Sequence, residues 1–294
     1  MDITPTLCGL IWKNNCKHMQ TILVTGGTSG IGLEIVKALL LEGCCVISTT
    51  RNAARSAELA KKLIQETNNN KLHFLEVDFA DFVSVRRYAD NVKDQFAKID
   101  VLINNAGTWE MSFKETNDGV EINLQINHLS PMLLTLELLP LLDKSGDARI
   151  VNTSSGAHRR NIFDFDDMEW RNKPYDGVAT YSQSKLFNLW FSLKLIDFLE
   201  GKNITVNTVH PGYVKTALFN NMGSRNWDGV ANAANGARSA LYAVLSSDVK
   251  QKSGLYLYHE SPDPALSPLA LDFNSAEKLW ELSLQYISRY FSII

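Results

Sequence analysis

Residues 20–32 read Q-T-I-L-V-T-G-G-T-S-G-I-G, and this stretch decides the fold of the chain. Its first half is a short apolar run, which is typical of a buried strand. Gly26, Gly30 and Gly32 follow and lead into residues with apolar side chains at helical spacing. Glycine permits a tight turn and lets the backbone approach a pyrophosphate, which a helix N-terminus then stabilises. The stretch therefore predicts a strand–turn–helix unit that binds a dinucleotide.

Strand and helix patterns alternate along the rest of the chain, which implies a parallel sheet covered by helices on both faces. We predict a single doubly wound α/β domain of the Rossmann type over residues 20–294, with a parallel sheet of about seven strands. Residues 1–19 are expected to form an N-terminal extension, and a long helix is expected around Glu121–Leu142. The predicted strands are Gln20–Thr25, Cys45–Thr49, Leu72–Val77, Val101–Asn104, Arg149–Thr153, Ile204–Val209 and Gly254–Tyr258.

Composition excludes several classes of protein. The 294 residues carry a net charge of −3 with 45% hydrophobic residues, so the chain has no basic excess for nucleic acid and can bury a substantial core. No apolar run approaches the roughly 18 residues of a membrane span. The four cysteines form no Cys-x-x-Cys pair, and the His residues show no metal-ligand spacing. We expect a cytoplasmic protein with reduced thiols and no metal site.

A second informative stretch is Tyr181-Ser182-Gln183-Ser184-Lys185, which lies 26 residues downstream of Ser155. A Tyr and a Lys four residues apart share one helix face, so both can point at one ligand. An ammonium near a phenol favours the phenolate, which makes the phenol a usable acid–base group. The pattern indicates proton transfer beside the dinucleotide.

With these motifs in register, the chain resembles the short-chain dehydrogenase/reductase family from about Thr21 to Tyr258. The resemblance implies a catalytic tetrad of Asn127, Ser155, Tyr181 and Lys185. Tyr181 would exchange a proton with the substrate oxygen, and Ser155 rather than Ser154 would hold that oxygen. Lys185 would bind the nicotinamide ribose and lower the pKa of Tyr181, while Asn127 would anchor a water. The implied cofactor-binding residues are Gly26, Thr28, Ser29, Gly30, Ile31, Gly32, Arg51, Asn52, Asp78, Phe79, Asn105, Ala106, Gly107, Tyr181, Lys185, Pro211, Gly212, Val214 and Thr216.

The end of the second predicted strand, Thr49-Thr50-Arg51-Asn52, bears on the choice of cofactor. An acidic residue there would bind a ribose 2′-OH, whereas an Arg accommodates a 2′-phosphate. No Asp or Glu lies between Cys45 and Arg55, and a guanidinium pairs well with phosphate. NADP(H) is therefore the predicted cofactor and NAD(H) the alternative; Arg51 as a plain surface charge is the other interpretation.

Within the family, the segments around Arg51, Asn127 and Ser155 look most like the retinol-dehydrogenase-like branch. We predict an oxidoreductase that interconverts an aldehyde or ketone and its alcohol on a small apolar substrate, as a homodimer or homotetramer. Segments 159–176 and 213–234 are expected to close over the substrate. The alternatives are a non-catalytic dinucleotide-binding regulator or scaffold, and a sugar-nucleotide epimerase, whose glycine spacing differs. Candidate pocket residues, each equally explained by packing, are Trp109, Met111, His158, Trp170, Tyr175, Phe219 and Trp227.

Overall fold

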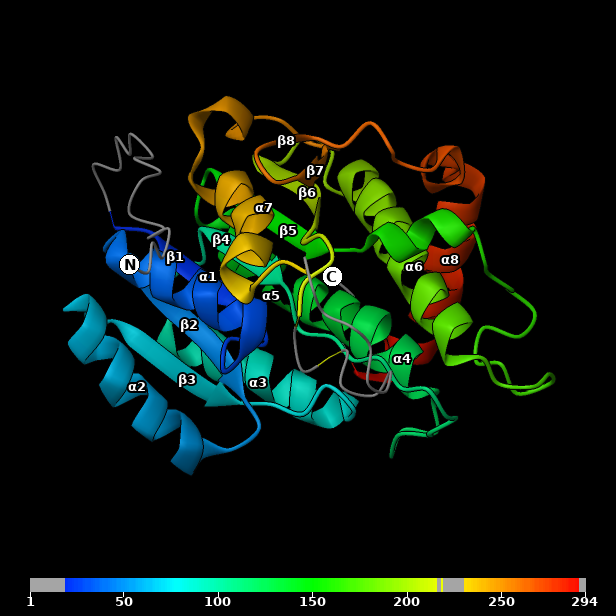
Figure 1. Ribbon diagram of the computed structural model, residues 1–294, viewed down its shortest axis with the longest axis horizontal. Helices are drawn as coiled ribbons and strands as arrows, with labels where there is room; N and C mark the ends of the chain where they lie inside the picture. Colours follow the sequence, from blue (N-terminus) through cyan, green and yellow to red (C-terminus); the bar gives the residue numbers. More distant parts are fainter. Residues whose placement is uncertain (1–18, 216–217, 219–229, 291–294) are drawn as a thin grey trace.

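The structure, a computed structural model, describes residues 19–215, 218 and 230–290. Its strands are β1 Thr21–Val24, β2 Cys45–Thr50, β3 Leu72–Glu76, β4 Val101–Asn104, β5 Ala148–Thr153, β6 Ile204–His210, β7 Tyr256–Tyr258 and β8 Ser261–Pro262. All eight lie in one sheet in the order β3-β2-β1-β4-β5-β6-β7-β8, with β3 and β8 at its edges (Figure 1). Neighbours pair in parallel apart from the antiparallel pair β7–β8.

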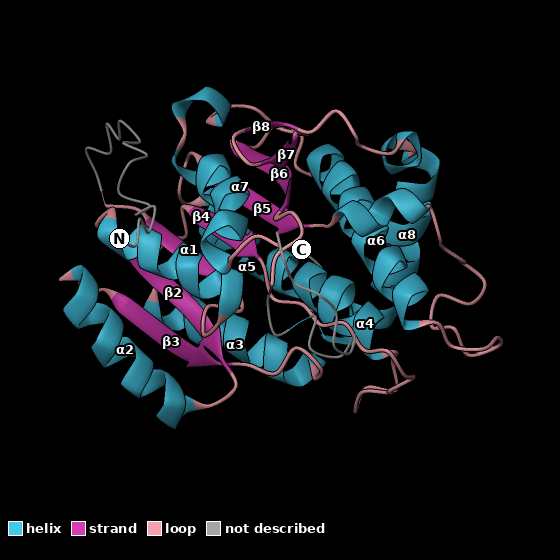
Figure 2. Cartoon of the chain, viewed as in Figure 1, coloured by secondary structure: helices cyan, strands magenta, loops and turns pink. Residues whose placement is uncertain are grey.

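Helices cover both faces of the sheet (Figure 2). One face carries α1 Gly30–Leu41, α2 Ala53–Thr67 and α7 Ala233–Leu245, and the other carries α3 Phe82–Gln95, α5 Ser130–Asp143, α6 Gly177–Phe198 and α8 Phe273–Ile287. Side chains of a strand point alternately to the two faces, so successive residues enter different cores. In β1, Leu23 packs in the core under α3 and α5, whereas Ile22 and Val24 pack under α1 and α7. The predicted doubly wound α/β domain is confirmed.

Three details differ from the sequence prediction. The expected helix at Glu121–Leu142 is interrupted: a short α4 (Ile122–Leu124) passes into a π-helical turn, η2 (Gln125–Leu129), before α5 begins. Helix α7 was not predicted, although Asn232 caps its first turn; its second half is buried almost all round. The two-residue β8 is an eighth strand, too short for a periodic signal. The predicted extension 1–19 lies outside the described residues apart from Met19.

The strand order places a crevice beside the glycine turn. From β1 the chain winds outward to β2 and β3, and it then returns to form β4 on the other side of β1. At such a reversal the following loops diverge, which leaves a crevice at the carboxyl ends of β1 and β4 where dinucleotides bind. The turn after β1 and the loop after β4 meet there, because Asn105 and Ala106 both donate backbone hydrogen bonds to Thr25 Oγ1 at 2.9 Å.

A buried polar network ties the middle of the sheet to the helices beneath it. Asn104 Nδ2 donates to Asn152 Oδ1 at 2.8 Å and to Thr135 Oγ1 of α5 at 2.9 Å. Asn152 Nδ2 donates in turn to Ser192 Oγ of α6 at 2.8 Å, and Thr208 of β6 donates to the same hydroxyl at 2.9 Å. Because these groups are buried, each lost partner leaves a desolvated polar atom. The network thus fixes α6, which carries Tyr181, against the sheet.

We expect Asn152→Ala to lower the free energy of unfolding by about 2–3 kcal/mol, because Asn104 and Ser192 each lose a buried hydrogen-bond partner. Urea unfolding followed by circular dichroism measures the change. Asn70→Ala, at an exposed loop position, is the control and should stay within about 0.5 kcal/mol of the wild type. Equal unfolding midpoints for Asn152→Ala and the wild type would show that the network is not stabilising.

Candidate active site

A cleft of about 440 Å³ opens at the carboxyl ends of the strands and contains most of the predicted site residues. It brings together the glycine turn after β1, the ends of β2 and β3, the loops after β4 and β5, and the loop after β6. The predicted residues that line it are Gly26, Thr28, Ser29, Gly30, Ile31, Gly32, Arg51, Asp78, Phe79, Asn105, Ala106, Gly107, Ser155, Tyr181, Lys185, Pro211, Gly212 and Val214. Asn127 and Asn52 do not line it, and Thr216 lies outside the described residues.

The glycine turn forms a cradle that no other residue type would leave open. Gly26 has φ +75° and Gly30 has φ +55°, a region that side chains disfavour. A Cβ on Gly32 would lie 2.2 Å from the Gly26 carbonyl oxygen. Ser29 precedes α1, and its side chain makes no capping hydrogen bond to the first turn of that helix. Backbone N–H groups at a helix N-terminus bind phosphate oxygens, so this cradle fits the pyrophosphate of a dinucleotide.

The far end of the cleft is formed by the ends of β2 and β3. Arg51 is exposed there and lines the cleft beside Thr50 and Asp78. Asn52 turns away and caps α2, since its side chain accepts a hydrogen bond from Arg55 N at 2.9 Å. Asn52 therefore caps α2 and does not line the cleft. Arg51 is a basic side chain that lines this end of the cleft.

Tyr181 and Ser155 meet on the floor of the cleft. Tyr181 belongs to α6 and is only 5% exposed, and the Ser155 side chain lies close enough to its hydroxyl to oppose the rise of its pKa. The neighbouring Ser154 points elsewhere, because its buried hydroxyl donates to the Lys185 carbonyl oxygen at 2.7 Å. Ser155 thus presents a hydroxyl to Tyr181, whereas Ser154 supports the helix.

Lys185 lies one turn further along α6. Its ammonium is 5.5 Å from the Tyr181 ring centroid and donates to the Thr153 carbonyl oxygen at 3.2 Å. Asn127, in the π-helical turn, lies behind Gly107: its Oδ1 accepts from Thr108 N at 2.7 Å. A Cβ on Gly107 would fall 3.0 Å from Asn127 Oδ1 and 3.6 Å from Lys185 Nζ. The four predicted catalytic residues therefore surround one point of the cleft, with Asn127 behind the other three.

Burial dominates the ionisation of this pair. It raises the pKa of Tyr181 to about 12, and the nearby Ser155 side chain opposes this rise. It also lowers the pKa of Lys185 to about 8. That Lys185 lowers the pKa of Tyr181 stays a prediction, because desolvation raises this pKa whether or not the ammonium opposes it. Tyr181 therefore keeps its proton at neutral pH and can act as an acid.

An aromatic wall closes one side of the cleft. The Trp109 indole stacks on the Tyr181 ring, with 4.3 Å between centroids and 9° between planes. Its Nε1 donates to the Gly177 carbonyl oxygen at 2.8 Å. Gly177 allows this approach, since a Cβ there would lie 2.5 Å from the Glu110 carbonyl oxygen. The wall is backed by Asn123, which accepts from Glu110 N at 2.9 Å.

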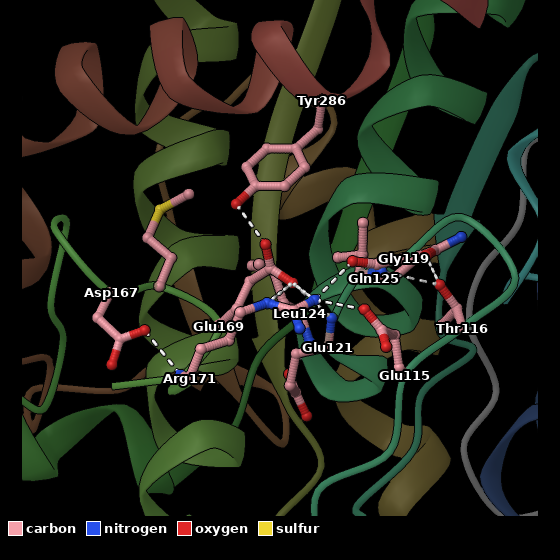
Figure 3. A network of polar contacts seen from close by, with 12 residues as sticks. Glu115, Thr116, Gly119, Glu121, Leu124, Gln125, Asp167, Glu169, Arg171 and Tyr286 are labelled. Carbon is pink, nitrogen blue, oxygen red and sulfur yellow. Dashed lines mark hydrogen bonds and ion pairs between the residues drawn. The ribbon is translucent and has the colours of Figure 1, made fainter. Parts of the chain in front are cut away.

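A polar network outside the cleft supports the wall (Figure 3). Glu121 is 1% exposed, caps α4 and accepts a hydrogen bond from Tyr175 Oη at 2.7 Å, and burial raises its pKa. Its backbone N–H donates to Glu169, which also binds Arg171 at 2.8 Å and Tyr286 of α8 at 3.0 Å. Segment 159–176, expected to close over the substrate, is thus joined to α8 and to the residues before α4.

The remaining candidate pocket residues have other roles or lie outside the described residues. His158 is fully buried and hydrogen-bonded, and Tyr175 serves the Glu121 network. The Lys173 ammonium lies over the Trp170 ring, 4.2 Å from its centroid. Met111 is 40% exposed and does not line the cleft. Phe219 and Trp227, like most of segment 213–234, are not among the described residues.

Several residues that line the cleft were missed from the sequence: Thr49, Thr50, Val77, Thr108, Glu110, Ile122, Ile126, Thr153 and Leu218. Strand-end positions adjacent to predicted residues could have suggested Thr50 and Thr108. Ile122 and Ile126 are four residues apart on α4 and η2, a spacing that places both on one helix face. No local signal distinguishes them from core residues. Among the described residues, no group of three His, Cys, Asp or Glu could hold a metal ion.

Comparison with known proteins fits this geometry. A family model described as short chain dehydrogenase matches residues 20–227. Retinol dehydrogenase 14 of Mus musculus is 35% identical over 289 residues, which cover 90% of this chain and 85% of that protein. The chain therefore belongs to the short-chain dehydrogenase/reductase family, whose members bind NAD(P)(H). Within that family it lies in the retinol-dehydrogenase-like branch.

Solved structures agree with the fold. A protein from Mycobacterium paratuberculosis is 32% identical with a TM-score of 0.76, over 92% of this chain and 93% of that one. A short chain dehydrogenase from Escherichia coli CFT073, complexed with NADPH, is 22% identical with a TM-score of 0.68. The match covers 82% of this chain and 97% of that one. Over the part of the chain that the structure describes, no helix is long and apolar enough to cross a membrane.

Gly32→Ala should weaken dinucleotide binding by roughly tenfold or more, because its Cβ would be forced against the Gly26 backbone and such overpacking costs about 1–3 kcal/mol. Quenching of protein fluorescence during titration with NADP⁺ and NAD⁺ gives the dissociation constants. Lys37→Ala, on the solvent side of the same helix, serves as the control. Unchanged affinity in Gly32→Ala would mean that the turn does not hold the pyrophosphate.

Proposed function

We propose that this protein is an NADP(H)-dependent carbonyl reductase and alcohol dehydrogenase acting on apolar substrates. The observation that carries the proposal is that Tyr181, Ser155 and Lys185 line the same cleft as the glycine cradle. A scaffold protein would need the cradle but not a protonated phenol beside a serine and a buried lysine. The relatives' family membership supports the same class of reaction.

The chain's own residues would handle the oxygen and its proton. Bound NADPH supplies a hydride to the carbonyl carbon. Tyr181 donates its hydroxyl proton to the carbonyl oxygen, and Ser155 donates a hydrogen bond to the same oxygen as negative charge develops there. The Lys185 ammonium stabilises the phenolate that Tyr181 leaves behind. Asn127 holds the loop after β4 through Thr108 and so keeps that side of the cleft in place. In the oxidative direction the Tyr181 phenolate would take the proton from the alcohol oxygen, and the hydride would return to the cofactor.

Two further features support the choice of partners. Arg51 lies at the end of the cleft where a ribose 2′-phosphate would sit in this fold, and it favours NADP(H) over NAD(H). Trp109 on the Tyr181 ring, together with Ile122 and Ile126, gives the cleft apolar surface, which suits an apolar aldehyde, ketone or alcohol. The retinol dehydrogenase named among the relatives suggests retinoid-like molecules for the substrate screen. A cytoplasmic location and a homodimer or homotetramer stay predictions from the sequence.

Tyr181→Phe removes only the proton donor, so turnover of apolar aldehydes and ketones should fall by ~10²-fold or more. The NADPH dissociation constant should change little. Oxidation of NADPH followed by absorbance measures turnover. Tyr88→Phe is the matched control: this buried tyrosine lies in α3, and its hydroxyl has no hydrogen-bond partner among the described residues. Retention of more than a tenth of wild-type turnover in Tyr181→Phe would contradict the assigned role.

Arg51→Ala should weaken NADPH far more than NADH, because a hydrogen-bonded charge pair contributes ~1.5–3 kcal/mol. Thr50→Asp should shift the preference further, since its carboxylate repels a 2′-phosphate and can accept from a 2′-OH. Dissociation constants for both cofactors are compared in each variant. Arg55→Ala, exposed near the start of α2, should leave the NADPH-to-NADH ratio unchanged. An equal loss for both cofactors in Arg51→Ala would refute the phosphate contact.

A further inference from the structure

Two histidines outside the tetrad hold opposite sides of one peptide group next to Ser155. The peptide between Ser155 and Gly156 has its carbonyl oxygen 2.7 Å from Nδ1 of His158. Its N–H group donates to Nδ1 of His210 at 3.3 Å. Neither side chain lines the cleft, and His158 is fully buried. The two imidazoles therefore hold the Ser155–Gly156 peptide by hydrogen bonds, next to the Ser155 hydroxyl that faces Tyr181.

The hydrogen-bond partners define the proton positions on both rings. A carbonyl oxygen only accepts, so His158 must carry its proton on Nδ1. Its Nε2 is the target of the Ser267 N–H at 3.2 Å and must be bare. His210 Nδ1 faces two donors, the N–H groups of Gly156 at 3.3 Å and Gly212 at 3.2 Å, so it must be bare too. Both rings are thus neutral and in opposite tautomers.

The surroundings keep the rings neutral and in place. Burial lowers the pKa of His158, and it lowers the pKa of His210 to about 4. Tyr256 packs edge-on against His158, with 5.2 Å between ring centroids and 77° between ring planes. Its ring is parallel to that of His210, with 6.3 Å between centroids. The Tyr258 ring also packs against His210, with 5.1 Å between centroids. A Cβ on Gly156 would lie 3.3 Å from His210 Nε2, so glycine at this position lets the ring lie close to the backbone.

His210 also joins two loops of the cleft. It ends β6, and the same nitrogen that accepts from Gly156 accepts from Gly212 in the loop that follows. Gly212 lines the cleft, with φ +84°. One neutral nitrogen therefore fixes the distance between the Ser155 loop and the loop after β6. A small change in such a distance has a large effect on the reaction rate, because a shift of about 1 Å can lower a rate by roughly 10²-fold.

We propose that His158 and His210 are positioning residues that clamp the Ser155–Gly156 peptide in the orientation that presents the Ser155 hydroxyl to Tyr181 and the substrate oxygen. This inference rests on the reductase function proposed above. His158 fixes the carbonyl side, and His210 fixes the N–H side together with the loop after β6. Neither residue touches the reacting atoms.

The test compares variants that remove each hydrogen bond with variants that restore it. Leucine at either position removes the bond, whereas the amide of asparagine can donate in place of His158 Nδ1 or accept in place of His210 Nδ1. We expect His158→Leu and His210→Leu to lower kcat by roughly tenfold or more, and His158→Asn and His210→Asn to recover most of it. His158→Leu should leave the NADPH dissociation constant unchanged, because His158 lies outside the cleft.

Asn69→Leu is the matched control for a purely structural effect. Asn69 also bridges two backbone groups, donating to the carbonyl oxygens of Leu40 and Cys44 at 2.9 Å each, far from the cleft. The Asn69→Leu variant should have a lower Tm than the wild type and the same kcat. If Asn69→Leu and the histidine variants lose kcat only in proportion to their loss of Tm, or if asparagine gives no recovery, the clamp is refuted.

A measurement without turnover separates this inference from the proposed function. Nitrogen NMR of the labelled imidazoles at pH 7, assigned with the two asparagine variants, should show His158 protonated only on Nδ1 and His210 only on Nε2. A doubly protonated ring or the opposite tautomer at either position overturns the clamp. Wild-type protein that turns over no carbonyl compound would instead overturn the proposed function, and the nitrogen spectrum would still decide the clamp.

Discussion

The close approach of Gly32 to the Gly26 carbonyl is the constraint on which the cleft depends. With only 2.2 Å available to a Cβ at Gly32, the first turn of α1 can sit directly on the end of β1. The same compactness lets Thr25 accept two backbone hydrogen bonds from the loop after β4, which pulls the neighbouring strand end against the turn. A side chain in the turn would push α1 away and open the crevice that receives the dinucleotide. The order of strands creates the crevice, but this contact sets its shape.

The chemistry at the other end of the cleft depends on burial. Tyr181 and Lys185 are both almost fully buried, and desolvation moves their pKa values in opposite directions, to about 12 and about 8. In water a phenol and an ammonium separated as these are would influence each other little. In a dry site desolvation keeps the phenol protonated, and an ammonium stabilises its anion more strongly than it would in water.

Support for the reacting groups comes from side chains that never enter the cleft. Glu121, Asn123 and Glu169 hold the loop that presses Trp109 against Tyr181, and His158 and His210 hold the peptide behind Ser155. Apart from the contact of His158 with the Ser155 carbonyl oxygen three residues away, these contacts join segments well separated in the sequence, and all of them are partly buried. The cleft is therefore built on interactions that the sheet and helices bring together, and a substitution at a distance can disturb it.

The sequence by itself determined the class of fold and the central residues of the site. The glycine turn, the alternation of strands and helices and the Tyr181–Lys185 spacing are local patterns, and local patterns are visible in a chain. They identified Gly26, Gly30, Gly32, Tyr181 and Lys185, and the resemblance to the family added Asn127 and Ser155. Segments without such periodicity were missed: the π-helical turn at Asn127 and the two-residue β8. Helix α7 was also missed, because its buried residues form a continuous run over its second half and not a one-sided pattern. Only the tertiary structure decided that burial raises the pKa of Tyr181, that Trp109 stacks on the Tyr181 ring, and that His210 contacts the peptide after Ser155. These features depend on contacts between residues distant in sequence and on exclusion of water, which local spacing does not encode.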